Sequence, residues 1–232
     1  MKLQSCKQYL LFRKKRTQPL RIVAEFLTSD TIHLARIQHS TNVEGPGVRS
    51  AIWVTGCSIK CVGCFNPHLW DKDNGFEMTI KNLVDEIVLA KKGDQRIEGV
   101  TWLGGEPFDQ SEALAVASKE LRAHGLSVMT FTGFKFSKLT EQNNPNLASN
   151  LALLSETDLL VDGPFIQAQI DNSRPWLGSR NQKFVFLSAR YSEVDVSSEI
   201  SDGVEIRVSE SGSISVNGWA EHPMLMELLS DL

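Results

Sequence analysis

From about residue 31 onward, short apolar runs alternate along the chain with amphipathic stretches. Residues 50–55 form an apolar run that predicts a buried strand. In residues 79–92, apolar side chains recur every three or four positions and stop before Gly93, which predicts a helix. By the same reasoning we expect strands over 99–103, 126–131, 158–162 and 183–187, helices within 137–155 that break near Pro145, and a helix over 109–124 that opens with a capping box of Asp109 and Glu112.

Strands that alternate with helices of this length predict an α/β fold with right-handed crossovers and a mostly parallel sheet, curved into part of a (β/α) barrel. Such sheets bind ligands at the carboxyl ends of their strands. Residues that suit ligand contact should therefore gather just after the predicted strands. They do so at 55–57 (Thr-Gly-Cys), 104–107 (Gly-Gly-Glu-Pro), 132–134 (Thr-Gly-Phe) and 163–165 (Gly-Pro-Phe).

The two ends of the chain differ from its centre, so we expect three regions. Residues 1–30 form a basic and poorly ordered extension, in which residues 1–22 carry seven Lys or Arg and no Asp or Glu. This extension is a solvated arm, a docking element or the product of an upstream-extended reading frame. Residues 31–191 form the main domain. Residues 192–232 start as a Ser- and acid-rich linker, continue as a hairpin over 204–216 and end in a short helix over 222–232.

Composition limits the classes of function. The 232 residues carry a net charge of −4, whereas general nucleic-acid-binding domains are usually basic. No apolar run is long enough for a membrane span, and the apolar stretch near residue 10 is too short for a signal peptide. We therefore expect a cytoplasmic protein without a nucleic-acid or membrane partner.

Three of the four cysteines lie within eight residues, as Cys57, Cys61 and Cys64. This spacing suits a metal centre in a reducing compartment better than disulfide bonds. Three thiolates on a four-iron cluster leave one iron without a protein ligand, which permits catalysis. Two alternatives remain open at this point: a structural zinc site completed by His68, and an electron-carrying cluster completed by Cys6.

The residues around these cysteines resemble those of the radical S-adenosylmethionine (SAM) enzymes, and more narrowly the family of activating proteins of anaerobic ribonucleoside-triphosphate reductases. The resemblance covers about residues 31–191. Its motifs are Glu44-Gly45-Pro46-Gly47-Val48-Arg49, Val54-Thr55-Gly56-Cys57, Gly63-Cys64-Phe65-Asn66-Pro67, Trp70-Asp71, Leu103-Gly104-Gly105-Glu106-Pro107-Phe108, Thr132-Gly133-Phe134, Leu160-Val161-Asp162-Gly163-Pro164-Phe165 and Gly178-Ser179-Arg180-Asn181-Gln182.

This resemblance implies a [4Fe–4S] cluster that binds SAM and cleaves it reductively to methionine and a 5′-deoxyadenosyl radical. The radical would take a hydrogen atom from a glycine of a partner glycyl-radical enzyme, the large anaerobic ribonucleotide reductase. Another glycyl-radical enzyme or a modified peptide is the alternative acceptor. A flavodoxin- or ferredoxin-type protein would donate the electron, and we expect Lys60 to be a solvated charge that eases its docking.

The same resemblance assigns roles to individual residues. No side chain receives a catalytic role, because the bound cofactor carries the chemistry. Gly45-Pro46-Gly47 and Arg49 would shape the mouth through which the partner enters, although Gly-Pro-Gly is also a common turn. Phe65 either covers the cofactor or packs in the core. The loop at 104–107 either receives the ammonium end of SAM or is an ordinary turn between a strand and a helix. The cluster ligands are Cys57, Cys61 and Cys64, and the cofactor-binding residues are Gly63, Cys64, Phe65, Gly104, Gly105, Glu106, Pro107, Asp162 and Asn181.

Overall fold

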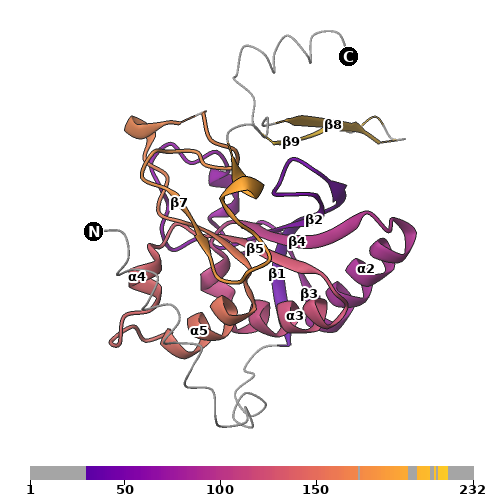
Figure 1. Ribbon diagram of the computed structural model, residues 1–232, viewed down its shortest axis with the longest axis horizontal. Coiled ribbons are helices and arrows are strands. Elements are labelled where there is room, and N and C mark those ends of the chain that lie inside the picture. The colour runs from indigo at the N-terminus through magenta and orange to yellow at the C-terminus, as the bar shows by residue number, and fades with distance from the viewer. Residues whose placement is uncertain (1–29, 172, 198–202, 210–211, 213, 219–232) are drawn as a thin grey trace.

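The computed structural model describes residues 30–171, 173–197, 203–209, 212 and 214–218 (Figure 1). A seven-stranded sheet in the order β3-β1-β2-β4-β5-β6-β7 forms its centre. The strands are β1 (Thr31–Thr41), β2 (Val48–Val54), β3 (Phe76–Thr79), β4 (Ile97–Gly104), β5 (Ser127–Phe131), β6 (Leu159–Asp162) and β7 (Lys183–Phe186). Residues 1–29 of the expected extension and the helix expected over 222–232 lie outside the described residues.

The middle of the sheet is parallel and its edges are antiparallel. Strands β2, β4, β5 and β6 run parallel to one another, whereas β1, β3 and β7 pair antiparallel with their neighbours. This confirms a mixed α/β fold with a mostly parallel central sheet. Among the described strands, β3 and β7 each pair on one side only, so strand pairing does not close the sheet into a barrel.

The helices connect the strands much as the apolar pattern predicts. Helix α2 starts after Thr79, whose hydroxyl accepts the Asn82 amide proton at 3.2 Å, and it ends at Gly93 as expected. No helix in the described part of the chain has the length and apolarity needed to cross a membrane. The α-helices are α2 (Ile80–Gly93), α3 (Ser111–Ala123), α4 (Phe136–Leu139) and α5 (Leu147–Glu156), and the 3-10 helices are η2 (Pro67–Leu69), η3 (Pro107–Gln110), η4 (Gln167–Gln169) and η5 (Glu193–Val196).

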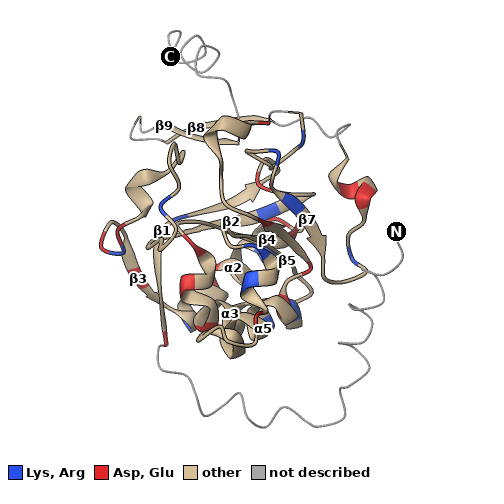
Figure 2. Cartoon of the chain, turned by 90° about the vertical axis from the view of Figure 1, so that its left-hand side faces the viewer, with Lys and Arg blue, Asp and Glu red and all other residues tan. Residues whose placement is uncertain are grey.

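The main core lies between the sheet and the helices. Helices α2, α3 and α5 gather on one side of the sheet (Figures 1 and 2). There the fully buried Trp102 of β4 packs among apolar residues of the helices, and its indole N–H donates to Ser118 Oγ at 2.9 Å. The central strands are buried on both faces, which explains their near-continuous apolar sequence.

The other face of the sheet carries a smaller core and the C-terminal hairpin. Strands β8 (Val204–Val208) and β9 (Ile214–Gly218) pair antiparallel as predicted and lie on the side away from the helices (Figure 2). The expected linker differs at its start. Ser192 and Asp195 form a capping box on η5, and Val196 is buried against the small core that contains Tyr191. Val196 thus packs against the smaller core, within the stretch expected as a linker.

Candidate cluster and cofactor cleft

The carboxyl ends of the parallel strands meet at one cleft of about 430 Å³. The residues expected just after strands line it together, namely Cys57 after β2, Gly104–Pro107 after β4, Thr132 and Gly133 after β5, and Gly163 and Phe165 after β6. The prediction that these segments would gather at one edge of the sheet is therefore confirmed.

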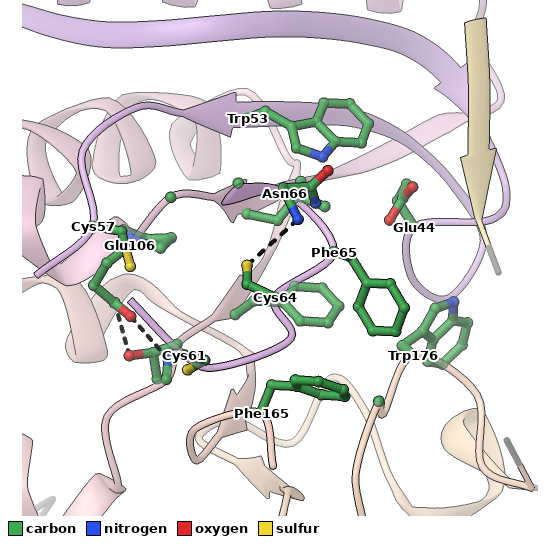
Figure 3. Close-up of a pocket in the computed structure, with 18 of the residues that line it drawn as sticks. Glu44, Trp53, Cys57, Cys61, Cys64, Phe65, Asn66, Glu106, Phe165 and Trp176 are labelled. Carbon is green, nitrogen blue, oxygen red and sulfur yellow. Dashed lines mark hydrogen bonds between the residues drawn. The ribbon is translucent and has the colours of Figure 1, made fainter. Parts of the chain in front are cut away.

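A tight loop between β2 and η2 presents all three cysteines to this cleft (Figure 3). The amide groups of Gly56 and Cys57 donate to the carbonyls of Leu69 and Trp70 at 2.9 and 3.1 Å, which closes the loop at its base. Inside the loop, Lys60 has a φ of 51° and Gly63 a φ of 75°. Two residues in the left-handed region let the chain reverse within a few positions, so three thiols share one wall.

The cysteine thiols are half-buried and free of disulfide bonds. Burial raises the pKa of Cys57, and the backbone of Lys60 and Ile59 opposes this effect. Burial likewise raises the pKa of Cys61, and a hydrogen bond with the backbone of Phe165 opposes this effect. These two thiols therefore hold their protons when no metal is bound, and metal binding must displace the protons.

Asp109 supports the cysteine loop, which corrects one sequence prediction. Its carboxylate accepts the Ser58 amide proton at 2.7 Å and the Ser58 hydroxyl proton at 2.8 Å. The expected capping box with Glu112 is wrong. Residues 107–110 form the 3-10 helix η3, and α3 begins only at Ser111, with Gln110 as an N-cap that makes no side-chain cap bond. Asp109 thus stabilises the turn next to Cys57.

The Gly104-Gly105 pair lies against the chain that enters the cysteine loop. A side-chain carbon at Gly105 would come within 2.2 Å of the Gly56 carbonyl oxygen, and Gly104 has a φ of 105°. The amides of Gly105 and Glu106 donate to the carbonyls of Val54 and Gly56, both at 2.8 Å. Only glycine fits this approach, so the pair fixes the β4 loop beside the cysteines.

Glu106 joins the loops that follow β4 and β5. Its side chain accepts the Thr132 hydroxyl proton and the Gly133 amide proton, both at 2.8 Å (Figure 3). It also accepts the Phe108 amide proton at 2.9 Å. Burial raises the pKa of Glu106 to about 7, although these three donors oppose the shift. A buried carboxyl therefore titrates near neutral pH in the wall of the cleft.

Aromatic rings form the wall beyond Cys64. The Phe65 side chain is 55% exposed and its ring centroid lies 5.1 Å from that of Phe165 (Figure 3). The alternative that Phe65 packs in the core is therefore wrong. The Asn66 amide donates to Cys64 Sγ at 3.4 Å, so the chain next to Phe65 turns back toward the thiol.

Three predicted cofactor residues, Gly63, Asp162 and Asn181, lie outside the cleft wall. Gly63 is exposed, and a side-chain carbon there would come within 2.8 Å of the Gln167 side chain. Asp162 is buried, and its carboxylate accepts the Phe136 amide proton at 2.8 Å at the start of α4. The Asn181 amide group donates to the Pro164 carbonyl at 2.7 Å, and its Oδ1 is buried without a partner among the described residues. The neighbouring Gln182, from the same motif, lines the cleft and donates to the Gly163 carbonyl at 3.0 Å.

Arg49 does not reach the mouth of the cleft, contrary to expectation. The side chain is fully buried and donates to Thr101 Oγ1 at 2.7 Å, Ser127 Oγ at 3.0 Å and the Tyr191 hydroxyl at 2.8 Å. Arg49 lies at the amino end of β2, and its hydrogen bonds hold β2, β4 and β5 together at the edge of the sheet opposite the cleft. Glu44 and Val43, just before Gly45, line the cleft in its place.

Several residues in the cleft belong to no short motif. The Arg36 guanidinium lies 3.8 Å from the centroid of the Trp53 ring, and both residues line the cleft. Trp70, by contrast, comes from the Trp70-Asp71 motif, and its indole N–H in the wall is buried without a hydrogen-bond partner among the described residues. Residues 216–218 of the hairpin complete the outer rim. Their sequence offers no signal for this position, because tertiary packing alone brings them there.

The donor set fits an iron–sulfur cluster with a bound small molecule. Three thiols line one wall, and the buried Trp70 N–H offers an unused donor to a ligand in the same cleft. The zinc alternative lacks this support, since His68 is exposed and does not line the cleft. Within the described residues, no three His, Cys, Asp or Glu side chains converge on a point suited to a single metal ion. A cubane instead takes each thiolate on a different iron.

Comparison with known proteins agrees with this geometry. Residues 43–185 match the sequence model of a family described as "4Fe-4S single cluster domain". The anaerobic ribonucleoside-triphosphate reductase-activating protein of Vibrio cholerae is 34% identical over 146 residues, which is 60% of this chain and 88% of that protein. The Escherichia coli protein of the same name is 32% identical over 146 residues, or 60% and 89% of the two chains.

A pyruvate formate-lyase-activating enzyme from Staphylococcus epidermidis is 35% identical over 96 residues, which is 40% of this chain and 38% of that enzyme. The family match spans the cysteine loop and the loops after β4, β5 and β6, which together build the cleft. The chain therefore belongs to the 4Fe-4S single cluster domain family and is a radical SAM enzyme of the glycyl-radical-activating type.

Proposed function

We propose that Cys57, Cys61 and Cys64 hold one [4Fe–4S] cluster and that the cleft binds SAM on the remaining iron. When bound, the cluster and SAM supply one-electron cleavage of the sulfonium and removal of a hydrogen atom from an acceptor. The observation that carries this proposal is the placement of three free, half-buried thiols in the wall of a cleft that is large enough for a second molecule.

The chain's own residues would hold and shield the cofactor. Cys64, Gly104, Gly105 and Pro107 line the space next to the thiols, and Phe65 with Phe165 would exclude water from its far side. Gly63 would act indirectly, through the left-handed turn that it allows in the cysteine loop. Glu106 keeps the loops after β4 and β5 at a fixed separation through its three hydrogen bonds. We assign Asp162 and Asn181 an indirect role, because their side chains hold Phe136 and Pro164 instead of facing the cleft.

We propose a glycine of an anaerobic ribonucleoside-triphosphate reductase as the acceptor, since relatives that match 60% of this chain are named as activators of that enzyme. The shorter match to a pyruvate formate-lyase-activating enzyme supports another glycyl-radical enzyme as the second candidate. A flavodoxin- or ferredoxin-type protein is the proposed electron donor. Lys60, which is exposed within the cysteine loop, would ease the docking of this donor through its positive charge.

We also infer that the sheet curves into part of a barrel, because residues from β1 and from the loop before β7 line one cleft.

Anaerobic reconstitution with iron and sulfide tests the proposal. We expect about four irons per chain and reductant-dependent cleavage of SAM to methionine. Cys61→Ala should lose both properties, whereas Cys6→Ala, a cysteine outside the motif, should keep them. Bound zinc with intact SAM, or an active cluster in Cys61→Ala, would contradict the proposal.

A further inference from the structure

The β8–β9 hairpin has a polar face, and one residue of that face, Asn217, lines the cleft. Glu205 lies directly opposite Asn217 in the register of the two strands, so their side chains share this face. Asn217 is only 3% exposed, while the other described residues of both strands are half-buried or exposed. Asparagine is usually a surface residue, so the most buried position of the hairpin is an unusual place for it.

This polar face has unused hydrogen-bonding capacity. Asn217 Nδ2, Asn217 Oδ1 and Glu205 Oε2 are buried and have no partner among the described residues. Buried polar groups without a partner destabilise a fold, and native proteins rarely keep several together. Two of these atoms belong to Asn217, which lines the cleft, and the third belongs to its cross-strand neighbour Glu205. They therefore indicate a place where a bound molecule completes the hydrogen bonds.

Hydrogen bonds fix the hairpin at the outer end of the cleft. Arg207 Nη2 donates to the Ser40 carbonyl at 2.8 Å, and the Gly218 amide donates to Glu44 Oε1 at 3.2 Å. Glu44 lies across the cleft from Cys57 and Glu106 (Figure 3). Asn217 lines the same cleft. The unused atoms thus lie away from the cluster loop, where a second ligand beside the cofactor would enter.

The charges around Asn217 favour a neutral ligand. Arg36 and Arg207 bring two positive charges, and Glu44 and Glu205 bring two negative ones. Both carboxylates lie close enough to act on the charge of Arg36, and Glu205 pairs with Arg207. A phosphate or carboxylate ligand would need an excess of positive charge. The amide of Asn217 instead offers N–H donors and a C=O acceptor, which match a peptide group.

We propose that the hairpin forms a subsite for the main chain of the acceptor polypeptide, in which Asn217 binds one peptide group and sets the position of the acceptor glycine. The subsite rests on the proposed function, because it takes the polypeptide that is to be activated. The family match ends at residue 185, so the hairpin lies beyond the shared domain and suits a role in the choice of partner.

Steady-state activation of the anaerobic reductase, followed by the glycyl-radical signal, tests this subsite. We expect Asn217→Leu, which keeps the size but removes the amide, to raise the KM for the reductase about tenfold at an unchanged kcat. Asn217→Ala should do the same. The matched control is Ser215→Ala, two residues earlier on the same face and outside the cleft wall, which should leave KM as it is.

The outcomes separate this inference from the function on which it rests. If the native chain does not cleave SAM, the proposed function fails. If the native chain activates the reductase and both Asn217 variants share its KM, the subsite is wrong. A raised KM for SAM in place of the reductase also overturns it, because Asn217 would then serve the cofactor. The iron-to-protein ratio of each variant shows whether the fold is intact.

Discussion

At the scale of single residues, Glu106 combines deep burial with three hydrogen-bond donors. Its side chain is 1% exposed, and the amides of Phe108 and Gly133 and the Thr132 hydroxyl all point at it. The donors favour the charged form and burial favours the neutral form, and burial prevails because the pKa rises to about 7. The folded chain therefore binds this proton more tightly than the unfolded chain.

A pH dependence of stability follows from this carboxyl. Because the folded pKa of about 7 exceeds the unfolded value of about 4.3, the stabilising contribution is full below about pH 4.3 and is lost as the pH rises through 7. The loss amounts to between about 3 and 4 kcal/mol. We expect the native chain to lose stability relative to Glu106→Gln between pH 5 and 8, measured by anaerobic denaturant unfolding of the cluster-loaded proteins. If the free energies of unfolding of the two proteins changed with pH in parallel, the pKa of Glu106 would not be raised.

Arg49 illustrates what a motif leaves undetermined at this scale. The sequence places it in the shared Glu44–Arg49 motif, and its charge suggests a surface role at the mouth of the cleft. Its partners, Thr101, Ser127 and Tyr191, are 52 to 142 residues away along the chain. A buried arginine needs such distant partners to satisfy its donors, and only the fold brings them together. Local sequence therefore predicts that Arg49 matters but not where it acts.

At the scale of elements, local signals succeed where the contacts are local. Thr79, the apolar period and Gly93 define α2 within one stretch of chain, and the structure confirms the helix. At the start of α3 the same reasoning fails, because Asp109 binds Ser58, which is 51 residues earlier, in preference to its own helix. A long-range contact overrides the capping signal.

The Asp109–Ser58 contact predicts a measurable effect on the cluster. Asp109→Ala leaves the amide and hydroxyl of Ser58 without their acceptor, so the loop that carries Cys57 loosens. We expect iron to be lost to a chelator about tenfold faster than from the native chain, as for other residues that support metal ligands. Asp85→Ala, which removes the same charge from the exposed face of α2, is the control. Equal rates in the two variants would show that the contact does not hold the loop.

At the scale of the whole molecule, the alternation of strands and helices predicts the parallel centre of the sheet and the edge strand β7, but not the other edge, which β1 and β3 form. Strand β1 pairs antiparallel with β2 across the short connection 42–47, and β3 pairs antiparallel with β1 across the long stretch 42–75. The residues of β1 and β3 lack the continuous apolar runs of β2 and β4. The cleft depends on these edges, since β1 supplies Arg36 and the hairpin closes the rim. The sequence thus predicts the end of the cleft that carries the cysteines, and tertiary packing determines the opposite end.

The C-terminal limit of the main domain is a further consequence of packing. Composition alone suggests a boundary after Tyr191, yet Val196 packs against Tyr191 and Leu177 in the smaller core. A chain that ends at Ser197 keeps this contact and the Ser192–Asp195 capping box, whereas a chain that ends at Tyr191 loses both. We expect the shorter chain to have a free energy of unfolding about 1–3 kcal/mol lower, measured by anaerobic denaturant unfolding. Equal stabilities would place the boundary at Tyr191 and make η5 part of a linker.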